Sequence, residues 1–192
     1  MPACSAALLG EAAFALLDTE TTGFGPERGA RICEIAVLVV RGGKVLDSFA
    51  SLVNPGGPID PGAQHVHGIT DAMVADSPSF KDVAAKVAEM LEGRVLVCHN
   101  APFDLPFLEW EFRRAGRPLP QVPVVCTLKL ARRHFGFASN RLGSIAEAIG
   151  AEARGLHRAG ADTEILRQVF AHMVKELVLR KDVRTLDDLL KL

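Results

Sequence analysis

The chain has 192 residues, of which 48% are hydrophobic and 23% are charged, and its formal net charge is −1. This length and composition favour one domain, covering 1–192, around an apolar core, and they exclude collagen-like, disordered and disulfide-rich secreted proteins. No apolar run reaches the roughly 18 residues of a membrane span. The four cysteines form no Cys-x-x-Cys pair, which indicates reduced thiols in a cytoplasmic protein with no membrane partner.

The first part of the sequence predicts an antiparallel meander of three strands. Apolar runs indicate strands at 14–18, 31–41 and 44–53. Gly42-Gly43 is typical of the hairpin turn that joins the last two. A turn is expected at 22–26, and a loop rich in proline and glycine is expected at 54–68.

Helices and strands alternate over the rest of the chain. Helices are expected at 79–92, from 102 to about 115, and near 127–135, 142–149, 161–180 and 182–192. Short apolar strands are expected at 94–98 and 122–126. This order predicts an α/β domain whose mixed five-stranded sheet begins with the antiparallel meander, continues with parallel strands, and carries helices on both faces. The motif-bearing core spans about 13–180, and 182–192 forms the short C-terminal helix.

The near-neutral total hides an uneven distribution of charge. Residues 1–112 hold 7 Lys and Arg against 15 Asp and Glu, whereas residues 113–192 hold 15 against 8, so the two parts carry −8 and +7. The basic C-terminal part can attract phosphate groups locally. The alternative is an ordinary solvated basic face, which charge alone does not exclude.

Two acids lie close together at the end of the first predicted strand. Asp18 and Glu20 are two residues apart, so their side chains share one face of the sheet. Two carboxylates at this spacing repel each other unless a cation lies between them. The alternative is a solvated strand end with no ligand.

Two further acids stand at the starts of predicted helices. Asp104 follows an apolar strand, and its alternative role is a favourable contact with the helix dipole. Asp162 begins a stripe of inward-facing residues, Asp162, Leu166, Val169 and Met173. Burying a lone carboxylate there is unfavourable unless it is paired or binds a metal. The alternative is that Asp162 is the N-cap of its helix.

His157 precedes Asp162 by five residues, and Gly155 and Gly160 are expected to let the chain bend so that its imidazole reaches the acids. Four oxygen-donor acids without a Cys or His cluster suit a hard cation, Mg²⁺ or Mn²⁺, rather than zinc. The sequence contains no Gly-rich phosphate loop and no Gly-x-Ser-x-Gly motif. These residues favour two-metal hydrolysis of a phosphate ester.

Three short segments resemble, in order and spacing, the motifs of a known enzyme family. Asp18-Thr19-Glu20-Thr21-Thr22-Gly23 resembles the first motif of the DnaQ-like 3′–5′ exonucleases, and His99 to Asp104 resembles the second. His157 followed by Asp162 resembles the third motif in its histidine form, called DEDDh. Val66-His67-Gly68-Ile69-Thr70 is similar to a further signature of the family.

The resemblance covers residues from about 16 to 178 and is greatest to the proofreading subunits of bacterial DNA polymerase III. It implies a ribonuclease-H-like fold, 3′–5′ exonuclease activity that releases nucleoside 5′-monophosphates, and His157 as the general base. It also implies two divalent cations, held by Asp18, Glu20, Asp104 and Asp162. Asp104 is expected to hold its cation through water molecules.

The resemblance also suggests residues that bind the substrate. They are Thr21 and Thr22, through backbone N–H groups toward the terminal 3′-hydroxyl, with Phe24, His67, Asn100 and Phe103 beside the last nucleotides. The alternative role for Phe103 is packing in the core beneath its helix. The alternative role for Phe24 is support of its own turn. Gly62 stands where many relatives have an acid that helps to hold the terminal sugar, so this contact is weaker here.

Three rival interpretations stay open. The first is an RNA-directed exonuclease of the RNase T or oligoribonuclease type, because the sequence does not show how a 2′-hydroxyl would be received. The second is a non-catalytic module that binds nucleic acid or a DNA polymerase subunit, and the third is a domain whose acids only cap helices. Because 30 residues follow Asp162, a stand-alone enzyme acting on single-stranded DNA or RNA 3′ ends is favoured over a proofreading subunit. The oligomeric state cannot be deduced from the sequence.

Overall fold

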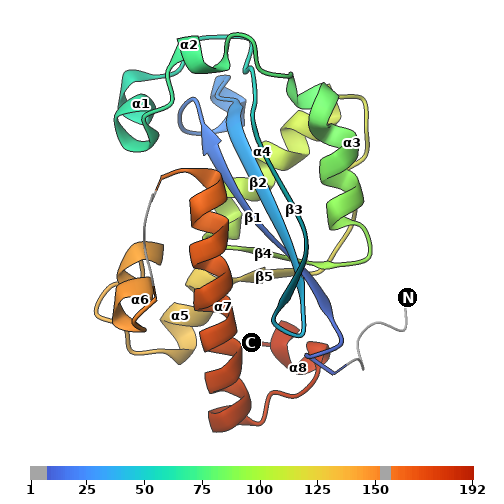
Figure 1. The fold of residues 1–192 in the computed structure, drawn as a ribbon, viewed down its shortest axis with the longest axis vertical. Coiled ribbons are helices and arrows are strands. Elements are labelled where there is room, and N and C mark those ends of the chain that lie inside the picture. Colours follow the sequence, from blue (N-terminus) through green and yellow to red (C-terminus); the bar gives the residue numbers. More distant parts are fainter. Residues whose placement is uncertain (1–7, 152–156) are drawn as a thin grey trace.

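A computed structural model describes residues 8–151 and 157–192. Within these residues, five strands form one mixed sheet in the order β3-β2-β1-β4-β5 (Figure 1). The strands β1 (Ala13–Thr21), β2 (Ile32–Arg41) and β3 (Lys44–Leu52) form the antiparallel meander. The strands β4 (Val95–Cys98) and β5 (Val124–Cys126) run parallel to β1. The predicted fold class is confirmed.

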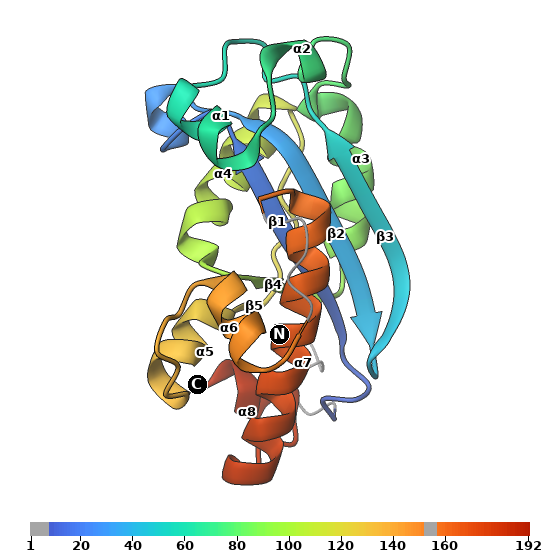
Figure 2. The same cartoon turned by 60° about the vertical axis from the view of Figure 1, so that its left-hand side comes forward.

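Helices cover both faces of the sheet because alternate residues of β1 and β2 face opposite cores. Phe14, Leu16 and Leu38 belong to the core under α7 (Ala159–Lys181), whereas Leu17 and Val37 belong to the core under α3 (Phe80–Leu91) and α4 (Ala101–Arg114). Figure 1 shows α7 running alongside β1 and β2. Figure 2 shows α5 (Thr127–His134), α6 (Leu142–Ala148) and α8 (Leu186–Leu190) gathered beside α7.

The remaining helices lie close to their predicted positions. Their bounds are α3 (Phe80–Leu91), α4 (Ala101–Arg114), α5 (Thr127–His134) and α6 (Leu142–Ala148). The last helix, α8 (Leu186–Leu190), is shorter than the predicted 182–192. Asp182 ends α7 in a left-handed conformation, with φ of 54°, and Thr185 caps the new helix through the N–H of Asp188. None of the helices in these described residues is long and apolar enough to cross a membrane.

The prediction of a loop over 54–68 is wrong, because the segment contains α1 (Pro61–His67). The side chain of Asp60 accepts the N–H of Gly62, Pro61 occupies the first turn, and Gly68 ends the helix with φ of 71°. These are standard signals for helix ends, which the density of proline and glycine obscured. A short helix, α2 (Asp71–Val74), follows α1, and a 3₁₀ turn, η1 (Pro26–Arg28), lies within the first loop.

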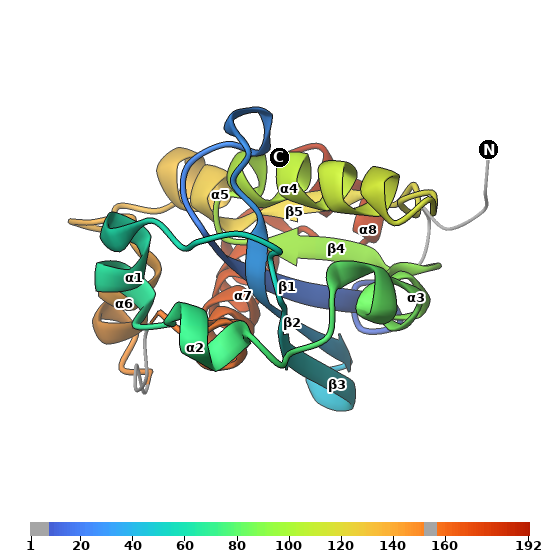
Figure 3. The ribbon, with the colours of Figure 1, turned by 90° about the horizontal axis from the view of Figure 1, so that it is seen from above.

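The strand β1 extends beyond the predicted 14–18, and its carboxyl end lies beneath α1 and α2. Figure 3 looks down on this end of the molecule, with α1 and α2 nearest to the viewer. Asp18 and Glu20 therefore lie inside β1 rather than after it, opposite Ala36 and Glu34 of β2. Their positions are fixed by the pairing of β1 with β2, whereas the pairing of β1 with β4 ends at Leu16.

The aromatic pair of Phe112 and Phe80 allows a direct test of the core between α3 and α4. Their rings meet edge to face, with centroids 5.4 Å apart, and both side chains are fully buried. Phe112→Ala should lower the free energy of unfolding by about 3–5 kcal/mol, because a cavity replaces the ring. Phe24→Ala is the matched control, since Phe24 is 84% exposed and its loss should cost less than about 0.5 kcal/mol. Urea denaturation of both variants checks this; equal stabilities would contradict it.

Candidate functional site

Three of the four predicted acidic ligands converge in space. Asp18 and Glu20 project from alternate positions of β1 toward the face that α7 covers, and Asp162 meets them from α7. One carboxylate oxygen from each of the three lies within 4.8 Å of the other two. The sheet and the long helix therefore bring together residues that are more than 140 positions apart in the sequence.

Asp162 reaches the cluster because α7 packs its apolar stripe against the sheet. Leu166, Val169 and Met173 are all buried, as the stripe predicts. The N-cap alternative is wrong, because α7 begins at Ala159 and Asp162 is its fourth residue. Oδ2 of Asp162 accepts the backbone N–H of His157 at 3.1 Å, and Oδ1 is buried without a hydrogen-bond partner in the described part of the chain.

Asp104 approaches from the other side of β1. It is buried in the first turn of α4, and its Oδ1 accepts the hydroxyl of Thr19 at 2.8 Å. Thr19 lies between Asp18 and Glu20 and faces the α4 side, so Asp104 stands next to the cluster rather than within it. Its predicted role of holding a cation through water stays a prediction.

The charges of these acids oppose one another. Burial, followed by the charges of Asp104 and Asp162, raises the pKa of Asp18 well above its ordinary 3.8. Burial and the charge of Asp162 raise the pKa of Glu20 from 4.5 to about 8. Burial also raises the pKa of Asp104 to about 7, against the hydrogen bond from Thr19. The negative charge of the site is thus not balanced by its protein neighbours.

This donor set fits a divalent cation. All of the converging atoms are carboxylate oxygens, which are the ligands that Mg²⁺ and Mn²⁺ prefer. The unpartnered Oδ1 of Asp162 is a buried acceptor that such an ion would satisfy. A cation would also remove the repulsion that raises the pKa values of Asp18 and Glu20.

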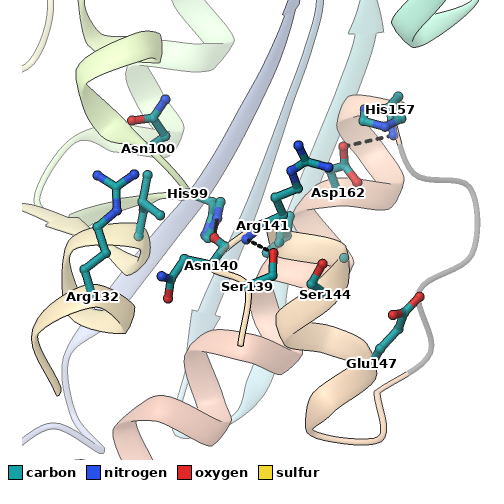
Figure 4. Close-up of a pocket in the computed structure, with 13 residues that line it drawn as sticks. His99, Asn100, Arg132, Ser139, Asn140, Arg141, Ser144, Glu147, His157 and Asp162 are labelled. Carbon is teal, nitrogen blue, oxygen red and sulfur yellow. Dashed lines mark hydrogen bonds between the residues drawn. The ribbon is translucent and has the colours of Figure 1, made fainter. Parts of the chain in front are cut away.

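His157 stands at the solvent edge of this cluster. It is exposed, its φ is 67°, and it lies next to Asp162 just before α7 (Figure 4). The predicted bend at Gly160 is wrong, because Gly160 lies inside α7, and His157 itself makes the left-handed turn. Gly155 lies outside the described residues.

Polar groups of Thr21 and Thr22, in the turn after β1, are engaged in hydrogen bonds within the protein. The N–H of Thr22 donates to the carbonyl of Arg31 at 2.8 Å, and the hydroxyl of Thr21 donates to the carbonyl of Gly23. The prediction that Thr22 offers a free N–H to the substrate is therefore wrong, because this group extends the pairing between β1 and β2. Phe24 is 84% exposed and does not support the turn.

The other predicted substrate residues occupy different environments. His67 is buried in α1, where Nδ1 accepts the N–H of Ile69 and Nε2 lies 3.2 Å from the carbonyl oxygen of Thr21. Asn100 is exposed, in a left-handed conformation at the start of α4. Phe103 packs against Phe107 with ring centroids 5.3 Å apart, as its core alternative requires. Substrate contact by these residues stays a prediction.

A pocket of about 740 Å³ opens beside the acids, lined by the segment between β4 and α4, by α5 and α6, and by the start of α7. His157 and Asp162 line one end, and Asn100, Arg132 and Arg141 also line it (Figure 4). Sequence reasoning named neither arginine, although the positive charge of the C-terminal part was a signal for them.

His99 holds the wall of this pocket in place. Its Nδ1 lies 2.9 Å from the hydroxyl of Thr127, and its Nε2 lies 2.9 Å from the carbonyl oxygen of Asn140. These contacts connect the end of β4 to the segment that carries Arg141. The second sequence motif thus contributes a residue that orders the pocket as well as an acid.

Comparison with known proteins agrees with this geometry. The RNase_T family model, described as Exonuclease, matches residues 16–170. The chain belongs to the DnaQ-like exonuclease family. It is 37% identical over 169 residues to DNA polymerase III subunit epsilon of Pasteurella multocida, covering 82% of this chain and 66% of that protein. It is 33% identical over 165 residues to 3′-5′ exonuclease DinG of Bacillus subtilis, covering 85% of this chain but 18% of that protein.

Solved structures show the same fold. Exonuclease X in complex with 5′ overhanging duplex DNA superimposes with a TM-score of 0.68 and 31% identity, covering 84% of this chain and 91% of that chain. Exonuclease I of E. coli in complex with a dT13 oligonucleotide superimposes with a TM-score of 0.76 over 90% of this chain and 42% of that chain. At 19% identity, the second likeness supports the ribonuclease-H-like fold alone. The chain spans less than a fifth of the DinG relative, so the activity and partners of the whole protein are proposals.

The raised pKa values predict how stability depends on pH without divalent cations. Since the pKa of Glu20 rises from 4.5 to about 8, the folded chain binds protons more tightly than the unfolded chain between these values. The free energy of unfolding should therefore fall as the pH rises from 4.5 toward 8. Thermal unfolding in a chelator checks this, and Glu20→Gln should flatten the dependence. Added Mn²⁺ should restore stability at pH 8, because it binds the folded state. The prediction would be contradicted if the free energy of unfolding in the chelator rose with pH.

Proposed function

We propose that this chain is a metal-dependent 3′–5′ exonuclease that hydrolyses the 3′-terminal phosphodiester bond of single-stranded DNA and releases nucleoside 5′-monophosphates. The observation that carries the proposal is the convergence of Asp18, Glu20 and Asp162, with a buried and unpartnered Oδ1 on Asp162. Membership of the exonuclease family, with residues 16–170 matched, supports the reaction class.

The acids hold two divalent cations, Mg²⁺ or Mn²⁺. Asp18, Glu20 and Asp162 supply direct carboxylate oxygens, and Asp104 acts from the α4 side, where Thr19 fixes its orientation. When bound, such cations neutralise the scissile phosphate and lower the pKa of the attacking water. The rigid placement of Asp18 and Glu20 within β1 keeps the ligand geometry constant during the reaction.

His157 serves as the general base. Its backbone N–H is fixed to Asp162, so its exposed ring lies at the edge of the acidic cluster, where it can take the proton of the attacking water. A histidine buried among the acids would form an ion pair with them. An exposed one is free to pass the proton to solvent after each cycle.

The pocket beside the cluster receives the strand that leads away from the 3′ end. Arg132 and Arg141 offer positive charge to its phosphates, and the exposed Asn100 offers an amide. Phe24 and Phe103 are proposed to contact the terminal nucleotides, as aromatic groups do in other single-strand grooves.

DNA is favoured over RNA because the exonuclease X structure, at 31% identity, is a complex with 5′ overhanging duplex DNA. The epsilon relatives are subunits of DNA polymerase III by name, which supports a DNA polymerase subunit as a candidate partner. The four cysteines without a Cys-x-x-Cys pair favour the cytoplasm as its compartment.

Digestion of 3′-ends tests the proposal. Single-stranded DNA and RNA of the same sequence, labelled at the 5′ end, are incubated side by side with Mg²⁺ or Mn²⁺ and resolved on a gel. DNA should shorten stepwise from the 3′ end with release of nucleoside 5′-monophosphates, and EDTA should stop the reaction. His157→Ala should lower kcat by about 10²- to 10⁴-fold, as loss of a general base does. No release from either substrate would favour a binding module, and a strong preference for RNA would favour the exoribonuclease alternative.

Salt dependence of binding tests the phosphate-binding role of the pocket. In EDTA, which keeps the substrate intact, Arg141→Ala should weaken binding of single-stranded DNA and reduce the slope of log Kd against log salt by about 1. Arg41→Ala is the matched control, because Arg41 pairs with Ala13 at the opposite end of β1 from the acids. Fluorescence anisotropy measures both; equal slopes for the two variants would place the strand elsewhere.

A further inference from the structure

Glu34 is a charged residue in β2, whose other residues from Ile32 to Val40 are apolar. It lies directly opposite Glu20 in the register of β1 and β2, and its side chain is only 7% exposed. Both of its carboxylate oxygens are engaged by the start of α7. Oε1 accepts Nη2 of Arg158 at 2.7 Å and Nε at 3.1 Å, and Oε2 accepts the backbone N–H of Ala159 at 2.8 Å.

The position of Glu34 is unfavourable in isolation. A buried carboxylate loses its hydration, and a like charge directly opposite in a sheet is destabilising. The guanidinium of Arg158 and the backbone N–H of Ala159 together satisfy both oxygens of the Glu34 carboxylate. Because these donors have fixed directions, the contact requires a defined geometry as well as an opposite charge. If stability of the fold were the only requirement, an apolar residue at position 34 would stabilise the protein at least as well as this buried ion pair does.

The ion pair between Glu34 and Arg158 anchors the N-terminus of α7 to β2. Arg158 is the N-cap and Ala159 the first residue of that helix, so β2 holds the two residues that follow His157. His157 has φ of 67°, a conformation that persists in a non-glycine residue only when its surroundings fix it. One such restraint is the hydrogen bond from its N–H to Asp162, and the other is the anchoring of Arg158 to Glu34.

We propose that Glu34 and Arg158 form a positioning pair that sets the location of His157 over the acidic cluster. The inference rests on the proposed function, since it assigns the pair to the general base of that reaction. Both residues are assigned a role through the backbone next to His157 and not through contact with the substrate. Without the pair, the start of α7 is free to move relative to β2, and His157 then spends less time in reach of the attacking water.

Kinetics of single variants provide the first test. Arg158→Met and Glu34→Gln should each lower kcat by about 10- to 100-fold, as loss of a residue that orients a catalytic group does. KM for single-stranded DNA should stay within about twofold, because the substrate pocket is unchanged. Glu164→Gln is the matched control, since it breaks the Glu164–Arg167 pair of the same helix, away from His157. If a single variant fails to fold, the double variant, which leaves no unpaired charge, takes its place.

A second measurement separates positioning from general stabilisation. In a His157→Ala background, Arg158→Met should cause no further loss of kcat beyond about twofold, because the group that the pair positions is gone. An equal loss in both backgrounds would overturn the inference. This comparison uses the residual rate of His157→Ala with Mn²⁺ in excess.

Amide hydrogen exchange provides a readout that needs neither metal nor activity. In metal-free protein, the N–H of His157 should exchange faster in Arg158→Met and Glu34→Gln than in wild type, and Glu164→Gln should leave it unchanged. If the N–H of His157 exchanges at the same rate in all variants, the positioning role of Glu34 and Arg158 is overturned, whatever their nuclease activity. A wild-type protein that releases no nucleotide would overturn the proposed function instead, while the exchange result would still decide the structural anchoring.

Discussion

Repulsion among carboxylates is the constraint on which the structure of the site depends. Asp18, Glu20 and Asp162 place oxygens within 4.8 Å of one another, and Asp104 adds its charge from the far side of β1. Burial, together with the charge of Asp162, raises the pKa of Glu20 to about 8. Only a rigid scaffold can hold such a cluster together, because each acid would move toward water if its backbone were free.

The fold supplies that rigidity through regular structure rather than loops. Asp18 and Glu20 lie inside β1, where both are paired with β2, and Asp162 heads the buried stripe of a 23-residue helix. Asp104 is oriented by Thr19 within the first turn of α4. The pairing of β2 with the start of α7 completes the frame.

Features that depend on local periodicity could be predicted from the sequence. Alternation put Asp18 and Glu20 on one face, and the spacing of Asp162, Leu166, Val169 and Met173 placed the first of these inward. The helix α1 was missed because Pro61 and Gly62 resemble a loop when the Asp60 cap is overlooked. Arg158 and Glu34 are 124 positions apart, so no local pattern reveals their contact, and the engagement of the Thr22 N–H depends on how β1 and β2 extend past a bulge.

Crystals grown with Mn²⁺ and a nucleoside 5′-monophosphate test the central claim most directly, because manganese is located by its anomalous scattering. The account predicts a strong anomalous peak among Asp18, Glu20 and Asp162, with a second peak on the Asp104 side and the phosphate of the nucleotide between them. The same crystals with Asp18→Asn should lose the first peak. If no anomalous density lies near these carboxylates in the wild type, the acids are not a metal centre and the account is wrong.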